Sequence, residues 1–523
     1  MLSLLKNHYV ISSLIFLVLG LLVLRWLGER AYTVTPQPPS SVMLNPTTNL
    51  YQSTQSLLQA QPANASASSA LTPLSNPHLA LLDRMVLADS AQATLDVQYY
   101  LFHDDEAGNA LLLNLLEAAK RGVKVRLLVD DMDMAGREGL FIRLLQLTPN
   151  LQIRVFNPFY GRMVRVPEYL ARFPRVTRRM HNKSYTADGV ISIVGGRNIG
   201  NEYFNVKTEV AFADLDLLVA GAIGQQVTSA FNAYWDSGLA VDMQQLGKPV
   251  DDNTFNQWLS KTQPLLQAYR QEMRKQRNEI SEVLNHLRRD IYYADLQVIY
   301  DHPQKVITAF TDTSGNIAPT IATLMKSAQQ HLLISSPYFI PGDYGLSLFQ
   351  ELRQRGVTIT ILTNSYAAND VPAVHAAYSK YRERLLAMGV QLFELKPLGA
   401  EEQADDGFAL LGSKRASLHA KAFIVDSQTV FVGSFNLDPR SAIHNTEMGV
   451  IFTNAAYSAQ SEQRSKRFIQ RFAYQVSLDP QGRLQWHDQQ TTPASLHTQE
   501  PDMHWWDHLL VEVIALLPVE WLM

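Results

Sequence analysis

The chain has 523 residues, of which 46% are apolar and 18% are charged. These fractions exclude an intrinsically disordered chain, and the length suggests about three domains. With 45 Lys and Arg against 49 Asp and Glu, the formal net charge is −4, which argues against a protein that binds nucleic acid through bulk electrostatics. There is no cysteine, so disulfides, thiolate zinc ligands and cysteine nucleophiles are all excluded.

The first 30 residues contain an apolar segment that we interpret as a membrane anchor or signal-like sequence. The run from Tyr9 to Leu24 is uncharged, and no small-residue cleavage site follows it, which favours an uncleaved anchor. The basic residues on its two sides are too evenly balanced to indicate its orientation. Residues 31–77 are rich in Pro, Ser and Thr and predict a tether, so structured sequence is expected to begin near His78.

The chain then repeats itself at a nearly constant interval. Arg121-Gly122-Val123 recurs as Arg355-Gly356-Val357, and an apolar strand followed by an amphipathic helix precedes each copy. The helix ends at Gly122 or Gly356, a residue suited to a helix C-terminus, and a β-branched strand follows. This order predicts a βαβ unit, and therefore a partly parallel sheet, in each copy.

The repeat predicts an α/β protein with two homologous domains, residues 78–250 and 293–480. We expect each domain to be a mixed β-sheet flanked by helices, and the two to pack with pseudo-twofold symmetry around one active site. Residues 251–292 between them are rich in Gln, Arg, Lys and Glu. They predict a solvated linker helix or, alternatively, a basic edge that meets anionic headgroups or phosphates.

The C-terminal tail, residues 481–523, contains a second apolar segment. Its stripe begins at Trp505-Trp506 and is broken at Pro518, and it is too short and too charged to span a membrane. The stripe fits either a helix packed on the second domain or an amphipathic helix that contacts lipid at the membrane interface.

A second repeated motif carries the candidate chemistry. His181, Lys183 and Asp188 recur 238 residues later as His419, Lys421 and Asp426. The same interval separates three further pairs of candidate supporting positions, which are Gly195-Gly196 and Gly433-Ser434, Asn198 and Asn436, and Glu209 and Glu447. An unchanged interval over this stretch indicates duplicated structure without a net insertion.

Residues i and i+2 of a strand face the same side, so each histidine is expected to point the same way as its lysine. Two such pairs in one pocket, together with the two asparagines, would form an anion site that suits a phosphodiester. One imidazole can attack phosphorus and the other can protonate the leaving oxygen. Since the lysines supply positive charge, we expect neither a metal nor a cofactor.

The carboxylates near the motif are expected to have two different roles. Glu209 and Glu447 are candidates for orienting the histidines through Nδ1–H, which would leave Nε2 free to react. Asp188 and Asp426 belong to the motif, and we expect them to stabilise its loop rather than to take part in the chemistry.

The segments His181–Asp188 and His419–Asp426 resemble the doubled HxKxxxxD signature of the phospholipase D superfamily, and the resemblance extends over roughly His78 to Val476. It implies two phospholipase D-like domains. It also implies that the histidines and lysines of both motifs are catalytic, with His181 as nucleophile and His419 as general acid and base.

Further segments are similar to bacterial cardiolipin synthases of the C type, namely Asp96–Tyr100, Phe156–Phe159, Arg178–Lys183 and Gly195–Phe204. This similarity implies a membrane-associated phosphatidyltransferase that makes cardiolipin through a phosphohistidine. The expected substrates are phosphatidylglycerol and either phosphatidylethanolamine or a second phosphatidylglycerol. The expected location is the bacterial cytoplasmic membrane, with a single N-terminal anchor.

Three alternatives remain open on the sequence. A hydrolytic phospholipase D would share the intermediate but use water as acceptor, and no residue spacing separates it from a transferase. A metal-independent phosphodiesterase or nuclease is disfavoured by the net charge, so no nucleic acid is expected as a partner. A membrane-tethered lipid-binding protein without turnover is disfavoured by the intact His and Lys pairs. The sequence pattern does not show whether a protein partner is required.

Overall fold

The computed structural model describes residues 44–62, 66–162, 165–276, 290–397, 415–490 and 495–516, together with 18–20, 22, 23, 26, 38, 40, 41 and 520. Most of the anchor predicted at Tyr9–Leu24 lies outside these residues. Within the part that is described, no helix is both long and apolar enough to cross a membrane.

Each half of the chain forms one mixed sheet, as the repeat predicted. Among the described residues the first sheet has nine strands and the second has ten. In spatial order the first contains β10 (Tyr292–Ala294), β1 (Ser69–Leu74), β8 (Asp216–Gly221), β6 (Ile191–Gly195), β5 (Ser184–Ala187), β2 (Thr94–Tyr99), β3 (Lys124–Asp130), β4 (Leu151–Phe156) and β9 (Ala240–Asp242). The second contains β11 (Leu296–Tyr300), β18 (Met448–Thr453), β17 (Thr429–Gly433), β16 (Lys421–Val425), β12 (His331–Ser335), β13 (Thr358–Asn364), β14 (Gln391–Leu395), β19 (Ala473–Leu478), β20 (Leu484–Asp488) and β21 (Ser495–His497).

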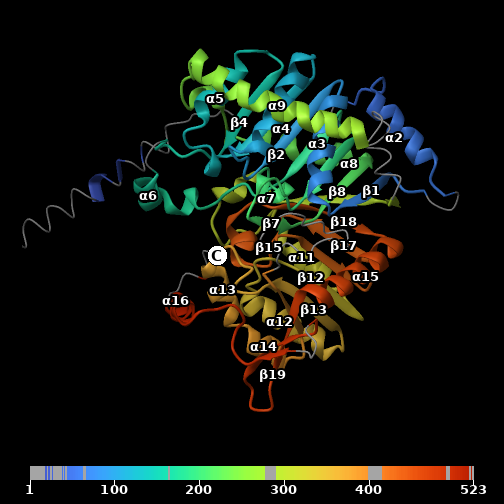
Figure 1. Cartoon of the computed structure of the whole chain (residues 1–523), viewed down its shortest axis with the longest axis vertical. Helices are drawn as coiled ribbons and strands as arrows, with labels where there is room; N and C mark the ends of the chain where they lie inside the picture. Colours follow the sequence, from blue (N-terminus) through green and yellow to red (C-terminus); the bar gives the residue numbers. More distant parts are fainter. Residues whose placement is uncertain are drawn as a thin grey trace, which may run out of the picture.

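Helices flank both sheets, and the two halves stack on one another in Figure 1. The first half contains α2 (Asn49–Gln59), α3 (Pro77–Ser90), α4 (Glu106–Lys120), α5 (Glu138–Leu145), α6 (Val166–Val176), α7 (Asn201–Phe204), α8 (Ala222–Trp235) and α9 (Asp252–Gln276). The second contains α11 (Ala318–Lys326), α12 (Gly342–Gln354), α13 (Pro372–Ser379), α14 (Arg382–Ala387), α15 (Ala455–Phe472) and α16 (Trp505–Leu516). Three adjacent strands of each sheet, β2-β3-β4 and β12-β13-β14, are parallel.

Local sequence explains why α4 begins and ends where it does. Asp105 caps its first turn by accepting a hydrogen bond from the Gly108 backbone N–H at 2.9 Å, and Lys120 lies in its last turn, where a cation is favourable. Gly122 follows with a φ of +104°, and Gly356 occupies the equivalent place after α12 with a φ of +83°. A residue without Cβ adopts this left-handed region at little cost, so both helices end at the predicted glycines.

Strand pairing joins the two halves directly. β7 (Val210–Ala213) of the first half pairs in parallel with β15 (Arg415–Leu418) of the second. An isolated parallel bridge links Met180 to Thr446. Because backbone hydrogen bonds cross the interface at two places close to the motifs, the relative position of the motifs is set by the fold itself.

The predicted tether, residues 31–77, is wrong over its second half. Leu50 and Leu57 of α2 are buried, as are Ala70 and Leu71 of β1. β1 lies between β8 and β10 within the first sheet, so the first domain begins well before His78. The Ser, Thr and Ala content of this segment concealed an apolar pattern that is sufficient for one helix and one strand.

The linker helix also belongs to the first domain. Phe255, Leu266 and Met273 on α9 are buried in the core that includes α4, so the helix is not simply solvated. Arg270 forms ion pairs with Asp89 at 2.6 Å and with Glu117 at 2.5 Å. These contacts place Arg270, one of the basic residues of the alternative basic edge, in ion pairs within the first domain. Residues 277–289 of the predicted linker lie outside the described residues.

The predicted tail, residues 481–523, is likewise part of a domain, because β20 and β21 extend the second sheet. Its final helix, α16, packs through Val511, which is 8% exposed, while Trp505 is 72% exposed. Trp506, Leu509, Leu510 and Val513 are exposed as well. The helix therefore both packs on the domain and presents an apolar face outward.

Candidate active site

The two motifs lie at corresponding ends of the two sheets. β5 begins directly after Lys183 and runs antiparallel to β2, and β16 begins at Lys421 and runs antiparallel to β12. The start of each motif strand therefore lies near the carboxyl ends of the parallel strands. Ligand sites of open α/β sheets usually occur at that end.

Each motif histidine is held by a carboxylate from the other half. Nδ1 of His181 lies 2.8 Å from a carboxylate oxygen of Glu447, and Nδ1 of His419 lies 2.5 Å from one of Asp214. Backbone hydrogen bonds also cross between the halves next to each histidine. The amide of His181 donates to the carbonyl of Thr446, and the amide of His419 donates to the carbonyl of Ala213, both at 2.8 Å. The halves are thus related by approximate twofold symmetry, and neither contains a complete site.

Asp214, and not Glu209, is the structural counterpart of Glu447. Gly195 pairs with Asp216 in the first sheet whereas Gly433 pairs with Gly449 in the second, so the interval between the copies falls from 238 to 233 residues. Five extra residues in the first copy form part of the segment that includes β7. Glu209 is exposed at the start of this segment. The expectation of an uninterrupted repeat was therefore wrong here, because the extra residues serve the pairing of β7 with β15.

The small residues of the motif let the carboxylates approach. A Cβ atom on Gly195 would collide with Asp216, and one on Gly196 would collide with the Asp214 carboxylate. In the second half Ser434 occupies the position of Gly196 and donates a hydrogen bond to Glu447. Ser441 donates to the other oxygen of Glu447 at 2.9 Å.

Gly433 has the same steric role on the second side. A Cβ there would meet the backbone of Met448 and Gly449. Glycine at this position therefore lets β18 lie close enough to β17 for Glu447 to reach the histidine of the first half.

Both lysines are buried beside their histidines. Each Nζ donates to the carbonyl oxygen of the histidine two residues earlier, at 2.6 Å for Lys183 and for Lys421. Nζ of Lys421 also lies 3.0 Å from Nδ1 and 3.1 Å from Nε2 of His419. Burial lowers the pKa of Lys421 to about 8 and lowers that of Lys183 well below its usual value. An anion placed between these groups would favour their charged forms.

The histidines are held in a weakly basic state. Burial, together with the charges of Lys183 and Lys421, lowers the pKa of His181 well below its usual value. Burial and Lys421 also lower the pKa of His419, although Asp214 opposes them. His181, neutral and donating Nδ1–H to Glu447, presents an unprotonated Nε2, which is the form required for attack on phosphorus. An anion bound beside His419 would favour its protonated form, which Asp214 supports.

The two carboxylates differ in their electrostatic environment. Burial alone would raise the pKa of Asp214, but His419, Lys421 and Arg197 hold it well below its usual range. Burial raises the pKa of Glu447. Of the two partners, Asp214 is therefore the stronger support for a positive charge on its histidine.

The two predicted asparagines are not equivalent. The side chain of Asn198 accepts a hydrogen bond from the Leu101 amide at 3.3 Å and donates to the Tyr203 hydroxyl at 2.8 Å, so it supports the loop. Asn436 is buried, and its Oδ1 has no hydrogen-bond partner among the described protein groups.

Asp188 and Asp426 contact backbone rather than the reacting groups. Asp188 accepts hydrogen bonds from the amides of Ala93 and Thr94, at 2.8 and 3.0 Å. Asp426 accepts from the amides of Gln330 and His331, at 2.7 and 2.9 Å. These contacts are those expected of residues that hold the motif loop, and the stabilising role itself stays a prediction.

Aromatic rings enclose the histidines, and the motif pattern did not reveal them. Tyr100 meets His181 edge-on with ring centroids 5.1 Å apart. Phe212 and Tyr203 lie at 5.0 and 5.3 Å from the ring of His419. These side chains account for part of the desolvation of the site.

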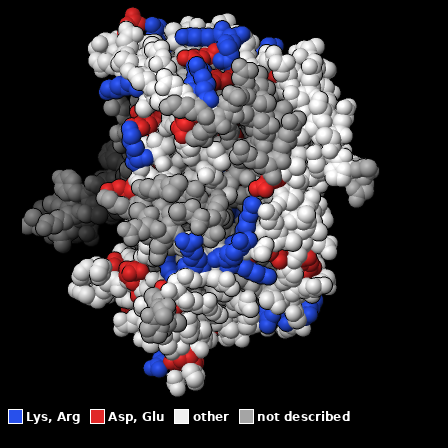
Figure 2. All heavy atoms as spheres, turned by 45° about the vertical axis from the view of Figure 1, so that its right-hand side comes forward, with Lys and Arg blue, Asp and Glu red and all other residues white. Residues whose placement is uncertain are grey.

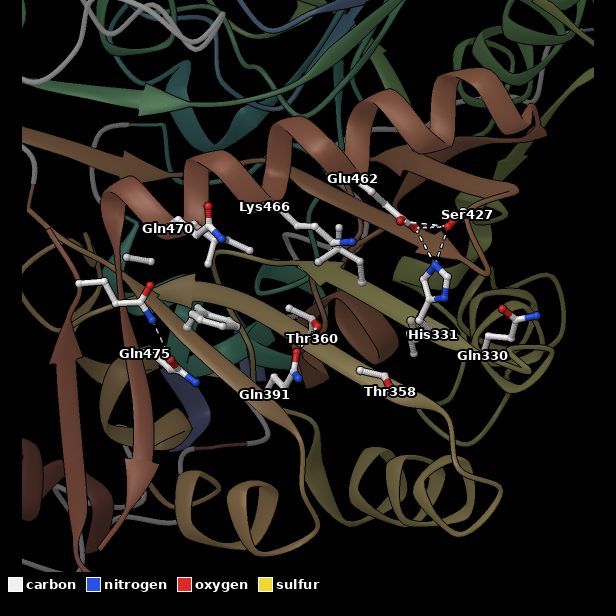
Figure 3. Close-up of a pocket in the computed structure, with 16 residues that line it drawn as sticks. Gln330, His331, Thr358, Thr360, Gln391, Ser427, Glu462, Lys466, Gln470 and Gln475 are labelled. Atoms are coloured by element: carbon white, nitrogen blue, oxygen red, sulfur yellow. Dashed lines mark hydrogen bonds and ion pairs between the residues drawn. The ribbon is translucent and has the colours of Figure 1, made fainter.

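A cavity of about 570 Å³ lies away from the motifs, beneath α15 at the amino ends of the strands β12 to β14. Figure 3 shows Thr358, Thr360 and Gln391 along its floor and a cluster of His331, Ser427 and Glu462 at one end. Both Ser427 and Glu462 contact Nε2 of His331, at 2.5 and 3.0 Å. A catalytic relay requires the two partners to contact different ring nitrogens, so this cluster is not a triad.

Comparisons with known proteins agree with this geometry. A family model described as "Cardiolipin synthase, PLD-like domain" matches residues 85–235 and 321–469. The chain is 38% identical to cardiolipin synthase C of Escherichia coli over 460 residues, which cover 87% of this chain and 96% of that protein. It is 33% identical to an uncharacterised protein of Helicobacter pylori over 386 residues, 72% of this chain and 75% of that one.

Among solved structures, a phosphatidylserine synthase of Haemophilus influenzae matches with a TM-score of 0.57 at 14% identity. The match covers 90% of this chain and 99% of that one, and it shows that the two-domain fold is shared. Two family matches in tandem, a relative aligned over nearly its whole length and a complete pair of motifs lead to one assignment. The chain belongs to the cardiolipin synthase family built from PLD-like domains, and it is a transferase of the phospholipase D superfamily.

Proposed function

We propose that this protein makes cardiolipin by transferring a phosphatidyl group to phosphatidylglycerol. The donor is phosphatidylethanolamine or a second phosphatidylglycerol. The observation that carries the proposal is the exchange of carboxylates between the halves, which places two oriented imidazoles and two buried lysines in one site. The identity to cardiolipin synthase C supports the choice of lipid substrates.

The reaction begins with the donor phosphodiester bound between Lys183 and Lys421. Nε2 of His181 attacks phosphorus, and the bond from phosphorus to the headgroup oxygen breaks. His419 donates a proton from Nε2 to that oxygen, and the headgroup alcohol leaves. We assign the proton to His419 because Asp214 favours an imidazolium more strongly than Glu447 does.

In the second step a hydroxyl of phosphatidylglycerol takes the place of the headgroup. His419 accepts the hydroxyl proton, the oxygen attacks phosphorus, and the bond from phosphorus to Nε2 of His181 breaks. The enzyme returns to its starting protonation state, so the cycle balances without a further reactant. Enclosure of the histidines by Tyr100 and Phe212 favours a lipid alcohol over water.

We further propose that the protein works at a bilayer surface. Val166 and Leu170 on α6 are 70% and 68% exposed, and α16 presents the exposed pair Trp505 and Trp506. The two helices come from different halves and project from the left-hand side of the molecule in Figure 1. Exposed apolar helix faces that carry tryptophan are typical of proteins that bind in the headgroup region of a membrane.

Each helix is tied to a segment next to a motif. α6 ends at Val176, five residues before His181. The Tyr366 hydroxyl, in the loop after β13, donates to Asp507 of α16 at 2.9 Å. The negative charge of Asp370, in the same loop, acts to raise the pKa of Lys421. A bilayer in contact with both helices would therefore lie close to the site.

The test is lipid mass spectrometry on purified protein with phosphatidylglycerol vesicles, with and without phosphatidylethanolamine. We expect cardiolipin together with released glycerol or ethanolamine, and no product from the His181→Ala and His419→Ala variants. Product limited to phosphatidic acid would show a hydrolase instead. Rapid quenching with labelled donor should place the label on His181, and label on His419 alone would reverse the assignment.

A nuclease is the weaker alternative. The formal net charge is −4, and on the face shown in Figure 2 Lys and Arg form a band across the lower middle and a group near the top, with acidic side chains beside them. Nicking of plasmid DNA without added metal, lost in the histidine variants, would revive that alternative.

A further inference from the structure

An apolar pocket opens at the catalytic end of the second sheet and has no role in the chemistry described above. Its cavity volume is about 280 Å³. α11, α12 and the loop after β17 form its walls, and its lining includes Ile321, Met325, Ile340, Leu348, Phe349 and Ala442. Asp343 and Asp438 are the only charged residues among those that line it. Such a lining favours hydrocarbon over a polar ligand.

One wall of this pocket is also a wall of the active site. Leu437 lines the pocket and accepts a hydrogen bond from the Ile340 amide at 2.7 Å. Asp438 accepts from the Ser441 amide at 2.6 Å, and the Ser441 hydroxyl donates to Glu447, the partner of His181. Asn436, whose buried Oδ1 lacks a described partner, precedes this wall in the chain. A ligand with an anionic head and an apolar chain could occupy both places.

A sequence difference distinguishes the corresponding place in the first half. The bridge from Phe102 to Ile199 in the first half corresponds to that from Phe339 to Leu437 in the second. Continuing in register, Phe204 corresponds to Ala442. Phe204 is fully buried, with the Arg84 guanidinium 5.2 Å from the centre of its ring. Replacement of that ring by a methyl group in the second half leaves space beside α12.

Two exposed apolar or aromatic side chains stand at the mouth of the pocket beside the exposed Asp343. Ile443 follows Ala442 and is 38% exposed, and Tyr344 on α12 is exposed. A chain that enters past Ile443 and Tyr344 would pass into an apolar interior.

We propose that this pocket binds one acyl chain of the phospholipid whose phosphodiester lies between the paired motifs. The inference rests on the proposed function, since it assumes a phospholipid substrate. Because the buried ring of Phe204 occupies the corresponding place in the first half, a site with nearly symmetric chemistry would hold its two lipids asymmetrically. One lipid is then bound through an acyl chain as well as through its phosphate.

The test uses the residue found in the first half. In Ala442→Phe the ring should fill the pocket, whereas Ala459→Phe on the exposed face of α15 adds the same ring away from it. Transfer is measured with dioleoyl and with dihexanoyl phosphatidylglycerol. Each buried methylene changes affinity by roughly fourfold, so long chains should suffer most. We expect the ratio of kcat/KM for the long-chain to the short-chain lipid to fall at least about tenfold in Ala442→Phe and to be unchanged in the control.

A second variant separates pocket filling from damage to the site, because Ala442 is close to the residues that hold Glu447. Ala322→Phe fills the pocket from α11 instead. A fall in the same ratio in this variant supports the proposal even if Ala442→Phe loses activity on both lipids. The proposal is overturned if the ratio is unchanged in Ala442→Phe and in Ala322→Phe, whether activity is retained or falls equally on the long-chain and the short-chain lipid. If the wild-type protein converts neither lipid, the proposed function itself fails, which is a distinguishable result.

Discussion

Asp214 lies 2.5 Å from Nδ1 of His419, although the two residues belong to different halves of the chain and are 205 positions apart. Glu447 and His181 form the reciprocal contact. The candidate active site therefore lies at the interface between the halves, and four predictions follow from its geometry and from the surfaces beside it.

The first prediction concerns the carboxylate partner of His419. Asp214→Asn keeps the shape of the side chain but removes the negative charge that supports an imidazolium. We expect kcat to fall on the order of 100-fold or more, as for other histidine-carboxylate pairs. Glu209→Gln is the matched control, since Glu209 is exposed, and its kcat should stay within about twofold. Equal effects of the two substitutions would contradict the assignment of Asp214.

The second prediction concerns pH. Because burial lowers the pKa of Lys421 to about 8, the free enzyme loses this charge as the pH rises past that value. We expect kcat/KM to decline above about pH 8. Arginine does not deprotonate in this range, so in Lys421→Arg the decline should move to higher pH even if the rate is lower. A profile that is the same in both proteins would show that another group controls the alkaline limb.

The same shift has a consequence for stability. Between about pH 8 and the usual lysine value of 10.5, Lys421 is protonated in the unfolded chain but not in the folded one. Its contribution to the free energy of unfolding therefore rises with pH over this window. Urea titrations at pH 8 and pH 10 should show a smaller rise for Lys421→Met than for the wild type.

The third prediction separates fold from chemistry within the motif. Asp188 accepts backbone hydrogen bonds and touches no reacting group. Asp188→Asn should lower the free energy of unfolding by about 2 kcal/mol, because hydrogen bonds to a charged acceptor are replaced by weaker ones. The kcat of the folded protein should change little. Wild-type stability combined with a large loss of kcat would instead give Asp188 a chemical role.

The fourth prediction tests the proposed bilayer contact. Replacement of Trp505 and Trp506 by Ala removes two large exposed rings from α16. We expect binding to phosphatidylglycerol vesicles to weaken at least about tenfold in a sedimentation assay. Leu496→Ala, an exposed apolar position on β21, serves as the control and should bind like the wild type. Unchanged binding of the double variant would leave α16 without a lipid contact.

Much of the site could be read from the chain because its key pattern is local. A histidine and a lysine two positions apart on a strand point the same way wherever the strand lies, and two copies identified the chemistry. The glycines after α4 and α12 predicted the ends of these helices for the same reason, since a left-handed φ is a property of one residue. Composition was a poorer guide, because it hid α2 and β1 within an apparent tether.

The sequence alone determined the duplicated α/β fold and predicted the four motif side chains of the candidate site, together with the backbone contacts of Asp188 and Asp426. Only the tertiary structure showed which carboxylate contacts His419. Five extra residues before β8 change the interval between the copies, and the pairing of the two halves then brings Asp214 to His419. The tertiary structure also revealed the apolar pocket beside α12. The pocket arises because Ala442 stands where the first half has Phe204, and the surrounding helices define its shape. Such contacts depend on how segments distant in sequence pack together, so the spacing of residues along one strand does not predict them.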